Sequence, residues 1–224
     1  MTDNTLINLN RRIDHSLLTQ EAGSAAIERL CKEAAEYHFH SVCVNPVWVS
    51  KAASVLNATD VAVASVTGFP LGAHRTDIKL AEALKAVDDG AAEIDMVANI
   101  GRIADNNFIW VGNEITTIRK QLPDSVILKV IVEVGKLSKP QLNSVTETVI
   151  DAGAQFIKTS TGFFGGVTVE QVKAIHAVTG NRIKIKASGG IRTPDDCRYL
   201  IEAGADRLGT SASVRIMREL AAGQ

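Results

Sequence analysis

IDAGAQFIKTSTG, residues 150–162, is the stretch from which the fold can be worked out. A helix ends here, and Gly153 is the residue expected where a helix closes with a left-handed cap. A short apolar strand at 155–158 follows at once and leads into a polar turn. The same order of an acid and a glycine before a strand recurs at 88–91 and 201–205. We therefore predict a repeated unit in which each helix leads into a strand.

Strands and helices alternate along the chain on both sides of this junction. The predicted strands are 12–18, 41–44, 61–66, 93–97, 126–132, 155–158, 182–187 and 207–209. Helical spacing of apolar residues predicts helices at 21–37, 46–56, 77–89, 105–120, 138–151, 168–178, from 193, and 211–222, with a short N-terminal helix at 3–10. Alternation implies parallel pairing with right-handed crossovers, and eight units in about 210 residues match a compact (β/α)8 barrel. We predict an α/β fold, a TIM barrel forming one domain over residues 1–224. An open doubly wound sheet is the competing fold, but it does not explain eight nearly equal units.

The composition indicates a globular chain and excludes several classes of partner. The 224 residues are 46% hydrophobic with a net charge of -1, which supports a substantial core and argues against disorder. There is no basic excess for nucleic acid, no apolar run of about 18 residues for a membrane span, and no signal peptide. Cys31, Cys43 and Cys197 are odd in number and widely spaced, as expected of free thiols in a reducing compartment. We expect a cytoplasmic protein.

The repeat also predicts which strand residues lie at the same height. Five residues after each repeated glycine come Asp95, Lys158 and Gly209, one on each of three strands. Barrel enzymes place their chemistry at the carboxyl ends of the strands, so residues at equal height can share one site.

Lys158 is the candidate nucleophile at that height. Burying an ammonium without a partner is costly, and burial depresses the pKa of a lysine. A neutral amine can attack a carbonyl and form a Schiff base. Charged side chains on neighbouring strands face the same interior: Asp95, Lys129 and Lys184 or Lys186, of which Lys186 is nearer the carboxyl end. A second ammonium favours the neutral form of Lys158, and Lys129 is a natural partner for Asp95. The alternatives are ion pairs within a polar barrel layer and a lysine that reaches solvent at its strand end.

Two glycine-rich turns predict a phosphate site. ASGGIRT at 187–193 and LGTSAS at 208–213 follow the seventh and eighth strands, and each precedes a helix. Backbone N–H groups in such turns can point at an anion, and barrel enzymes often hold phosphate after these two strands. The alternative is ordinary helix capping by Thr193 and Ser211. The GxGxxG pattern of a dinucleotide site is absent, and the five histidines are too scattered to suggest a metal.

An ordered set of motifs resembles the deoxyribose-phosphate aldolases, a class I aldolase family. The motifs are RRIDHSLL, SVCVNPVWV, VTGFPLGA, DDGAAEIDMVANIG, LKVIVEVGKL, FIKTSTGF, IKASGGIRT and GTSAS, and they span about residues 12 to 215. The resemblance implies a (β/α)8 barrel that reversibly cleaves 2-deoxy-D-ribose 5-phosphate into acetaldehyde and D-glyceraldehyde 3-phosphate, in deoxyribose phosphate catabolism. It implies no metal and no organic cofactor. The partners it implies are a small phosphorylated sugar, short aldehydes and a second copy of the chain in a homodimer.

The resemblance also implies a role for each matching residue. Lys158 is the Schiff-base nucleophile, Lys186 favours its neutral form, and Asp95 acts with a water in proton transfer. Lys129 holds Asp95, while Thr161 and Asp14 lie near the sugar hydroxyls. The expected phosphate cradle is Gly162, Gly189, Gly190, Gly209 and Ser211.

Departures from the family pattern affect two of these expectations. Some members carry a lysine after STG where this chain has Phe163, so phosphate affinity could be lower. Some end in a tyrosine that assists proton transfer, whereas the tyrosines here are Tyr37 and Tyr199, so proton transfer is expected to rest on Asp95 and water. Cys43 is interpreted as a packing thiol. The alternative functions are another Schiff-base aldolase or transaldolase-like barrel, and a phosphosugar-binding barrel without turnover.

Overall fold

Eight short apolar strands pair in chain order and close into a parallel barrel in the computed structural model, which describes residues 4–222. They are β1 (Ile13–Leu17), β2 (Ser41–Val44), β3 (Ala62–Thr67), β4 (Glu93–Val97), β5 (Ile127–Ile131), β6 (Phe156–Lys158), β7 (Lys184–Ser188) and β8 (Arg207–Thr210). β1 pairs with both β2 and β8, so the first and last strands close the barrel. The predicted (β/α)8 architecture is confirmed.

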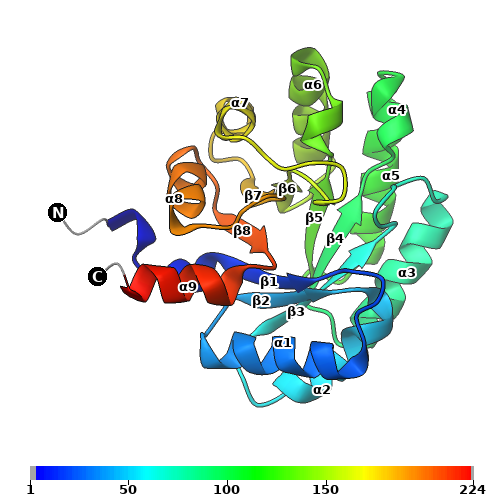
Figure 1. Ribbon diagram of the computed structural model, residues 1–224. Coiled ribbons are helices and arrows are strands. Elements are labelled where there is room, and N and C mark those ends of the chain that lie inside the picture. Colours follow the sequence, from blue (N-terminus) through cyan, green and yellow to red (C-terminus); the bar gives the residue numbers. More distant parts are fainter. Residues whose placement is uncertain (1–3, 223–224) are drawn as a thin grey trace.

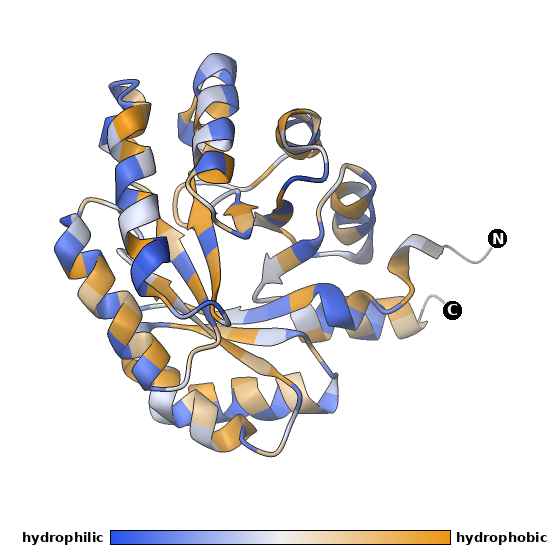
Figure 2. Ribbon diagram, turned by 180° about the vertical axis from the view of Figure 1, so that it is seen from behind, coloured by the Kyte–Doolittle hydropathy of each residue, from blue (hydrophilic) through white to orange (hydrophobic). Residues whose placement is uncertain are grey.

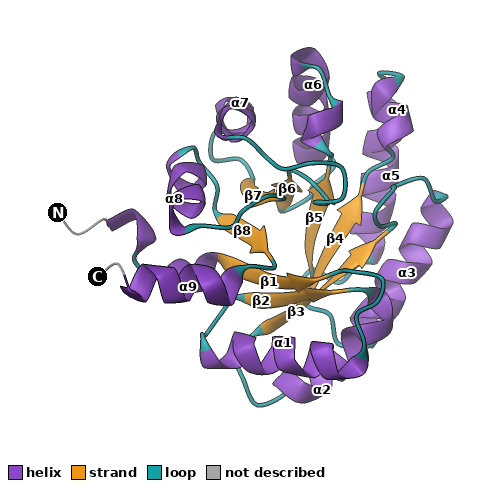
Figure 3. Ribbon diagram, viewed as in Figure 1, coloured by secondary structure: helices purple, strands orange, loops and turns teal. Residues whose placement is uncertain are grey.

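Helices surround the strands and form the outer layer (Figure 1; Figure 3). They are α1 (Ser24–Glu36), α2 (Val49–Leu56), α3 (Thr76–Asp88), α4 (Ile100–Ala104), α5 (Phe108–Gln121), α6 (Lys139–Asp151), α7 (Val169–Thr179), α8 (Pro194–Glu202) and α9 (Ser213–Ala222). Short 3-10 helices are η1 (Asn4–Leu6), η2 (Leu9–Arg12), η3 (Pro46–Trp48) and η4 (Val134–Lys136). None of the helices formed by residues 4–222 has both the length and the apolar character needed to cross a membrane.

The strands send apolar and charged side chains to opposite faces. Along β4, buried Ile94 and Met96 alternate with buried Glu93 and Asp95. Successive strand residues point to opposite sides of a sheet, so the apolar set packs under the helices and the charged set points into the barrel. The helices show the complementary pattern, with hydrophobic and hydrophilic residues interspersed along each one (Figure 2). The charged residues are therefore inside because their strands alternate.

Three helices begin with reciprocal caps that position the loops at the barrel mouth. The side chains of Ser138, Thr168 and Thr193 each accept the backbone N–H three residues on, and the side chain at that third position accepts the cap residue's N–H in return. Such capping boxes define the first turn of a helix. The predicted starts at Ser138 and Thr193 are confirmed, whereas α9 begins at Ser213, two residues later than expected.

The helix predicted at 105–120 is confirmed as α5, with bounds at Phe108 and Gln121. A short helix that was not predicted, α4, precedes it, and Asn106 separates the two in a left-handed conformation with φ 56°. Asn99 and Asn107 cap them, each accepting a backbone N–H with its side-chain oxygen. Asparagine side chains compete with helical hydrogen bonds and favour caps, so three asparagines impose the break.

Two further boundaries differ from the predictions. The N-terminal helix expected at 3–10 is a pair of 3-10 turns, η1 and η2, and residue 3 lies outside the described residues. Pro46 begins the 3-10 helix η3, and the α-helix starts only at Val49.

Candidate active site

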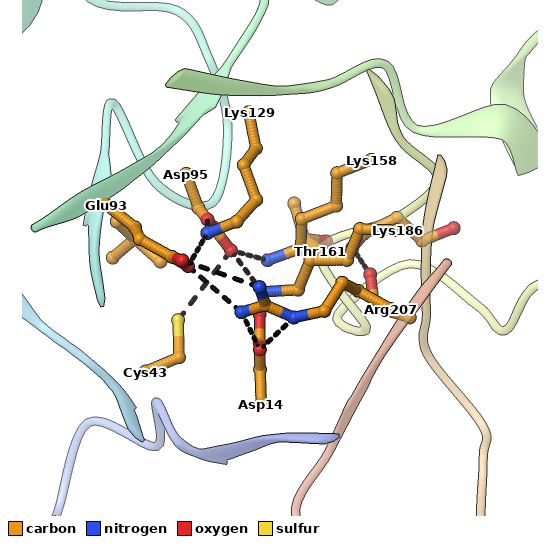
Figure 4. A network of polar contacts seen from close by, with 12 residues as sticks. Asp14, Cys43, Glu93, Asp95, Lys129, Lys158, Thr161, Lys186 and Arg207 are labelled. Carbon is orange, nitrogen blue, oxygen red and sulfur yellow. Dashed lines mark hydrogen bonds and ion pairs between the residues drawn. The ribbon is translucent and has the colours of Figure 1, made fainter. Parts of the chain in front are cut away.

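Three lysines converge on one carboxylate inside the barrel. Asp95 on β4 receives Lys129 Nζ on Oδ1 at 2.7 Å, and both Lys158 Nζ and Lys186 Nζ on Oδ2 at 2.7 Å (Figure 4). The lysines come from β5, β6 and β7, the three strands that follow β4. The structure thus brings together four residues that the sequence predicted to share a site.

A second layer of charges lies toward the amino ends of the strands. Lys129 Nζ also contacts Glu93 Oε2 at 2.6 Å, and Lys186 Nζ pairs with Asp14. Arg207 on β8 donates to Asp14 Oδ1 from Nε at 2.8 Å and contacts Glu93 Oε2 at 3.1 Å. The guanidinium therefore bridges the carboxylates of β1 and β4 across the barrel.

Counted over residues 4–222, the charges of this network leave one cation in excess. Lys129, Lys186 and Arg207 each contact two carboxylates, whereas Lys158 forms an ion pair with Asp95 through an oxygen that Lys186 shares. Four basic side chains face three carboxylates, Asp14, Glu93 and Asp95, so one proton can leave without stranding a buried anion. Lys158 is the basic group whose deprotonation disturbs the fewest ion pairs.

The other members of the network are held ionised. Burial alone would raise the pKa of Asp95, but the ammonium groups of Lys129, Lys158 and Lys186 lower it well below its ordinary range. Burial opposes the charge of Lys186 as well, yet Asp14 and Asp95 raise the pKa of this lysine. Lys129 behaves in the same way, with its pKa raised by Asp95 and Glu93 against the effect of burial.

A cavity of about 370 Å³ opens above the network at the carboxyl ends of the strands. Lys158 and Lys186 reach its wall, together with Thr161 and Cys43. Asp14, Asp95 and Lys129 are fully buried and are not among the lining residues. A small carbonyl compound in this cavity would therefore meet the two lysines first.

Glycine-rich turns line the cavity on the side of β6, β7 and β8. All five residues predicted to cradle phosphate are part of its wall: Gly162, Gly189, Gly190, Gly209 and Ser211. Gly189 has φ +94°, and a Cβ there would lie 2.9 Å from Gly165 O. Gly209 is packed as closely, since a Cβ would lie 3.1 Å from the side chains of Lys186 and Ser188. A side chain at Gly189 or Gly209 would disturb the close packing of the wall.

The remaining predicted residues fall at different depths. Thr161 lines the cavity, whereas Asp14 lies in the ion network beneath it. Lys184, the alternative to Lys186, is exposed at the start of β7, with Nζ 5.7 Å from the centroid of the Phe156 ring. Phe163 is 53% exposed at the rim and meets Phe69 edge to face.

Cys43 lies beside the network as a buried thiol. Its Sγ is 3.8 Å from Asp95 Oδ2. Burial raises the pKa of the thiol, and the negative charge of Asp95 raises it further. A thiol that stays protonated is a poor nucleophile, which agrees with a packing role.

Sequence reasoning missed five residues of this region. Arg207 and Glu93 complete the lower ion layer, Glu133 accepts two hydrogen bonds from Thr161, and Arg192 and Arg215 line the cavity beside the glycine turns. The strand alternation that selected Asp95 also selects Glu93, two residues earlier. No comparable pattern indicates Glu133, which follows β5.

Comparison with known proteins agrees with this geometry. A model of a family described as DeoC/LacD family aldolase matches residues 8–211. A deoxyribose-phosphate aldolase of Natranaerobius thermophilus is 46% identical over 215 residues, which are 96% of this chain and 98% of that protein. One from Mycoplasma mobile is also 46% identical, over 95% of this chain and 98% of the relative.

Solved structures show the same relationship. The crystal structure of a putative deoxyribose-phosphate aldolase from Coccidioides immitis superposes with a TM-score of 0.93 at 40% identity, covering 95% of this chain and 85% of that one. A deoxyribose phosphate aldolase from Aeropyrum pernix, described as a unique tetrameric structure, gives a TM-score of 0.90 at 30% identity over 96% and 92% of the two chains.

Proposed function

This chain belongs to the DeoC/LacD aldolase family, and from that membership we propose that it is a class I aldolase acting on 2-deoxy-D-ribose 5-phosphate. The reaction is reversible cleavage to D-glyceraldehyde 3-phosphate and acetaldehyde, and it serves the breakdown of deoxyribose phosphate. The observation that carries the proposal is the position of Lys158. It reaches the cavity wall above a network whose other basic groups are each held by two carboxylates.

The mechanism begins with the neutral amine of Lys158. It attacks C1 of the open-chain sugar, and loss of water gives an iminium. The C3 hydroxyl then loses its proton, the C2–C3 bond breaks, and its electrons move into the iminium to leave an enamine. Glyceraldehyde 3-phosphate departs, C2 of the enamine is protonated, and hydrolysis releases acetaldehyde and restores the lysine.

Asp95 and Lys186 support these steps from below. The Oδ2 atom of Asp95 lies 2.7 Å from both Lys158 Nζ and Lys186 Nζ. From there the carboxylate holds the lysines in place and positions a water for proton transfer at C2. Lys186 keeps its positive charge and, as the neighbouring ammonium, favours the neutral form of Lys158.

The phosphate is assigned to the glycine-rich side of the cavity. Backbone N–H groups near Gly189 and Gly209 supply hydrogen bonds, and the guanidinium groups of Arg192 and Arg215 supply positive charge on the same wall. These arginines offset the replacement of a lysine by Phe163.

Reductive trapping tests the proposal. The protein is incubated with deoxyribose 5-phosphate and borohydride, and intact and peptide masses are measured. We expect a two-carbon adduct on Lys158. A different adduct on Lys158 would keep the mechanism and change the substrate. A folded protein with no adduct on any lysine would contradict the aldolase and favour a phosphosugar-binding barrel.

Three broader proposals accompany this one. Residues 1–224 form one domain, supported by a single barrel that runs from Ile13 to Thr210. The chain works in the reducing cytoplasm, supported by three free, buried cysteines. It assembles as a homodimer, and the tetrameric structure described for the Aeropyrum pernix relative supports self-assembly. Sedimentation as a monomer would contradict the dimer.

A further inference from the structure

Glu133 is a buried carboxylate in an unusual backbone conformation beside the cavity. It lies two residues beyond β5 with φ 53° and ψ 63°, in the left-handed region that residues other than glycine rarely adopt. The residue is 3% exposed. Within residues 4–222, both hydrogen bonds accepted by its carboxylate come from Thr161: the backbone N–H at 3.1 Å and the hydroxyl at 2.6 Å. Strained residues of this kind are concentrated at functional sites.

The hydrogen bonds of Thr161 fix what its hydroxyl can do. A hydroxyl has one proton to donate and two lone pairs to accept. The proton is directed at Glu133 Oε2, and one lone pair accepts the backbone N–H of Phe163 at 3.2 Å. Thr161 lines the cavity, so the lone pair that remains can accept a hydrogen bond from a ligand. The group that it recognises must be a donor, such as a sugar hydroxyl.

We propose that Glu133 takes up, through Thr161, the proton that the C3 hydroxyl of the sugar loses when the C2–C3 bond breaks. The inference rests on the proposed function. The C3 hydroxyl gives its proton to Thr161 Oγ1 while Thr161 gives its own to Glu133 Oε2. The oxygen electrons form the aldehyde carbonyl, and the electrons of the C2–C3 bond pass to the iminium. In the synthetic direction the same protons return, so Glu133 acts on the substrate through Thr161 as a positioning residue.

The carboxylate of Asp95 is poorly placed for this step. It is not among the residues that line the cavity, and its two oxygens already accept hydrogen bonds from three ammonium groups. Those ammonium groups lower its pKa well below the ordinary range despite full burial, which makes it a weak proton acceptor. The donors to Glu133 are neutral, and one of them carries a transferable proton. The two carboxylates thus have different roles: Asp95 positions the water that acts at C2, and Glu133 receives the proton of the C3 oxygen.

A variant that separates two half-reactions tests the proposal. Glu133→Gln keeps a side-chain oxygen that can accept both hydrogen bonds from Thr161 but cannot take up a proton. Cleavage of deoxyribose 5-phosphate should lose at least about 100-fold in kcat, in the range that general base catalysis supplies, with little change in KM. The second half-reaction is the exchange of acetaldehyde methyl hydrogens for deuterium in heavy water, which NMR follows. This exchange needs the imine and the enamine but no C3 hydroxyl. Its rate in Glu133→Gln should stay within about twofold of the wild-type rate.

Variants of Thr161 provide the matched control and carry the test if Glu133→Gln does not fold. Thr161→Val removes the hydroxyl and should lose cleavage but keep exchange. Thr161→Ser, which restores the hydroxyl, should cleave at least about tenfold faster than Thr161→Val. The double variant Thr161→Val/Glu133→Gln should cleave no more slowly than either single variant, because both substitutions interrupt the same relay. Unchanged cleavage in Glu133→Gln would overturn the relay, and so would equal loss of cleavage and exchange, which indicates a structural role. A wild-type protein with neither exchange nor borohydride trapping would overturn the aldolase itself and, with it, the relay.

Discussion

Lys158 and Lys186 are the same residue type on neighbouring strands, and their partners make them chemically different. Lys186 lies between Asp14 and Asp95, whereas Lys158 shares one oxygen of Asp95 and faces the cavity. Both lysines are at most 3% exposed, so burial does not distinguish them. The number of carboxylates that contact each amine does. A buried charge with two partners is structural, and the one left over is available for chemistry.

This difference predicts that the same substitution changes the free energy of unfolding little at Lys158 and lowers it strongly at Lys186. Lys158→Met removes the excess positive charge, so we expect no borohydride adduct and no cleavage, with a free energy of unfolding within about 1 kcal/mol of the wild type. Lys186→Met breaks two buried ion pairs, those with Asp14 and Asp95, where Lys158→Met breaks one, and should destabilise the fold by about 3–5 kcal/mol. Urea unfolding of both variants checks the difference. Equal destabilisation would refute the claim that Lys186, with two carboxylate partners, is the structural lysine.

At the scale of single residues, the sequence predicted the upper charged layer well. Asp95, Lys129, Lys158 and Lys186 were identifiable because alternation along short strands sends every second side chain inward. Glu93 and Arg207 follow the same alternation, but their ion pair joins β4 to β8, two strands that are not adjacent in the barrel. Glu133 was not predictable, because a left-handed conformation outside glycine and asparagine depends on tertiary contacts.

Among the structural elements, the loops after β6 and β7 support each other at the phosphate side of the cavity. The backbone N–H of Val167 donates to Gly189 O at 3.1 Å, and a Cβ on Gly166 would meet the same oxygen at 3.0 Å. Thr159 Oγ1 accepts the N–H of Ser188 at 3.0 Å, which ties the two strand ends together. The two loops therefore form one connected wall, and a shift of either loop would break contacts with the other.

Gly189→Ala should perturb that wall selectively. A Cβ at this position meets Gly165 O at 2.9 Å with φ +94°, so the turn must move. We expect KM for deoxyribose 5-phosphate to rise by about tenfold, equivalent to about 1.4 kcal/mol, while activity on unphosphorylated deoxyribose changes little. Gly135→Ala is the control, since a Cβ there has no heavy atom within 4 Å. Equal losses on both sugars would show that the turn does not read phosphate.

The order of elements was predictable because apolar periods of two and about 3.6 alternate clearly along the chain. The short helix α4 was not. Its five residues are too few to show a helical period, and the asparagines that separate it from α5 act through caps and a left-handed turn rather than through hydropathy.

For the molecule as a whole, His15 joins segments from the two ends of the chain. On β1, its Nδ1 lies 3.0 Å from Ser213 Oγ at the start of α9, and its Nε2 lies 3.0 Å from Glu33 Oε2 on α1. The ring packs on Phe39 at a centroid distance of 5.2 Å. Burial lowers the pKa of His15, and the Glu33 carboxylate only partly opposes that effect.

This burial predicts a pH dependence of stability. The pKa of His15 is lower in the folded state than in the unfolded state, so the unfolded chain binds a proton more readily. The contribution of His15 to stability is present above about pH 6.5 and is lost as pH falls toward the folded-state pKa, by about 1.4 kcal/mol for each pH unit that separates the two pKa values. Urea unfolding at pH 7.5 and 5.5 should show a smaller difference in His15→Gln than in the wild type. An identical difference would exclude His15 as the source.

The link between Asp14 and Arg207 spans 193 residues, and β1 cannot pair with β8 until Arg207–Thr210 has been synthesised. During synthesis on the ribosome, the first strand emerges with its carboxylate long before the guanidinium that neutralises it has been translated. The nascent chain thus carries a charged strand that cannot be buried at low energy, and the barrel closes only after β8 has been translated. A chain that terminates before Lys186 lacks both counter-ions of Asp14, and we expect it to be degraded by proteases rather than to persist as a stable, inactive fragment.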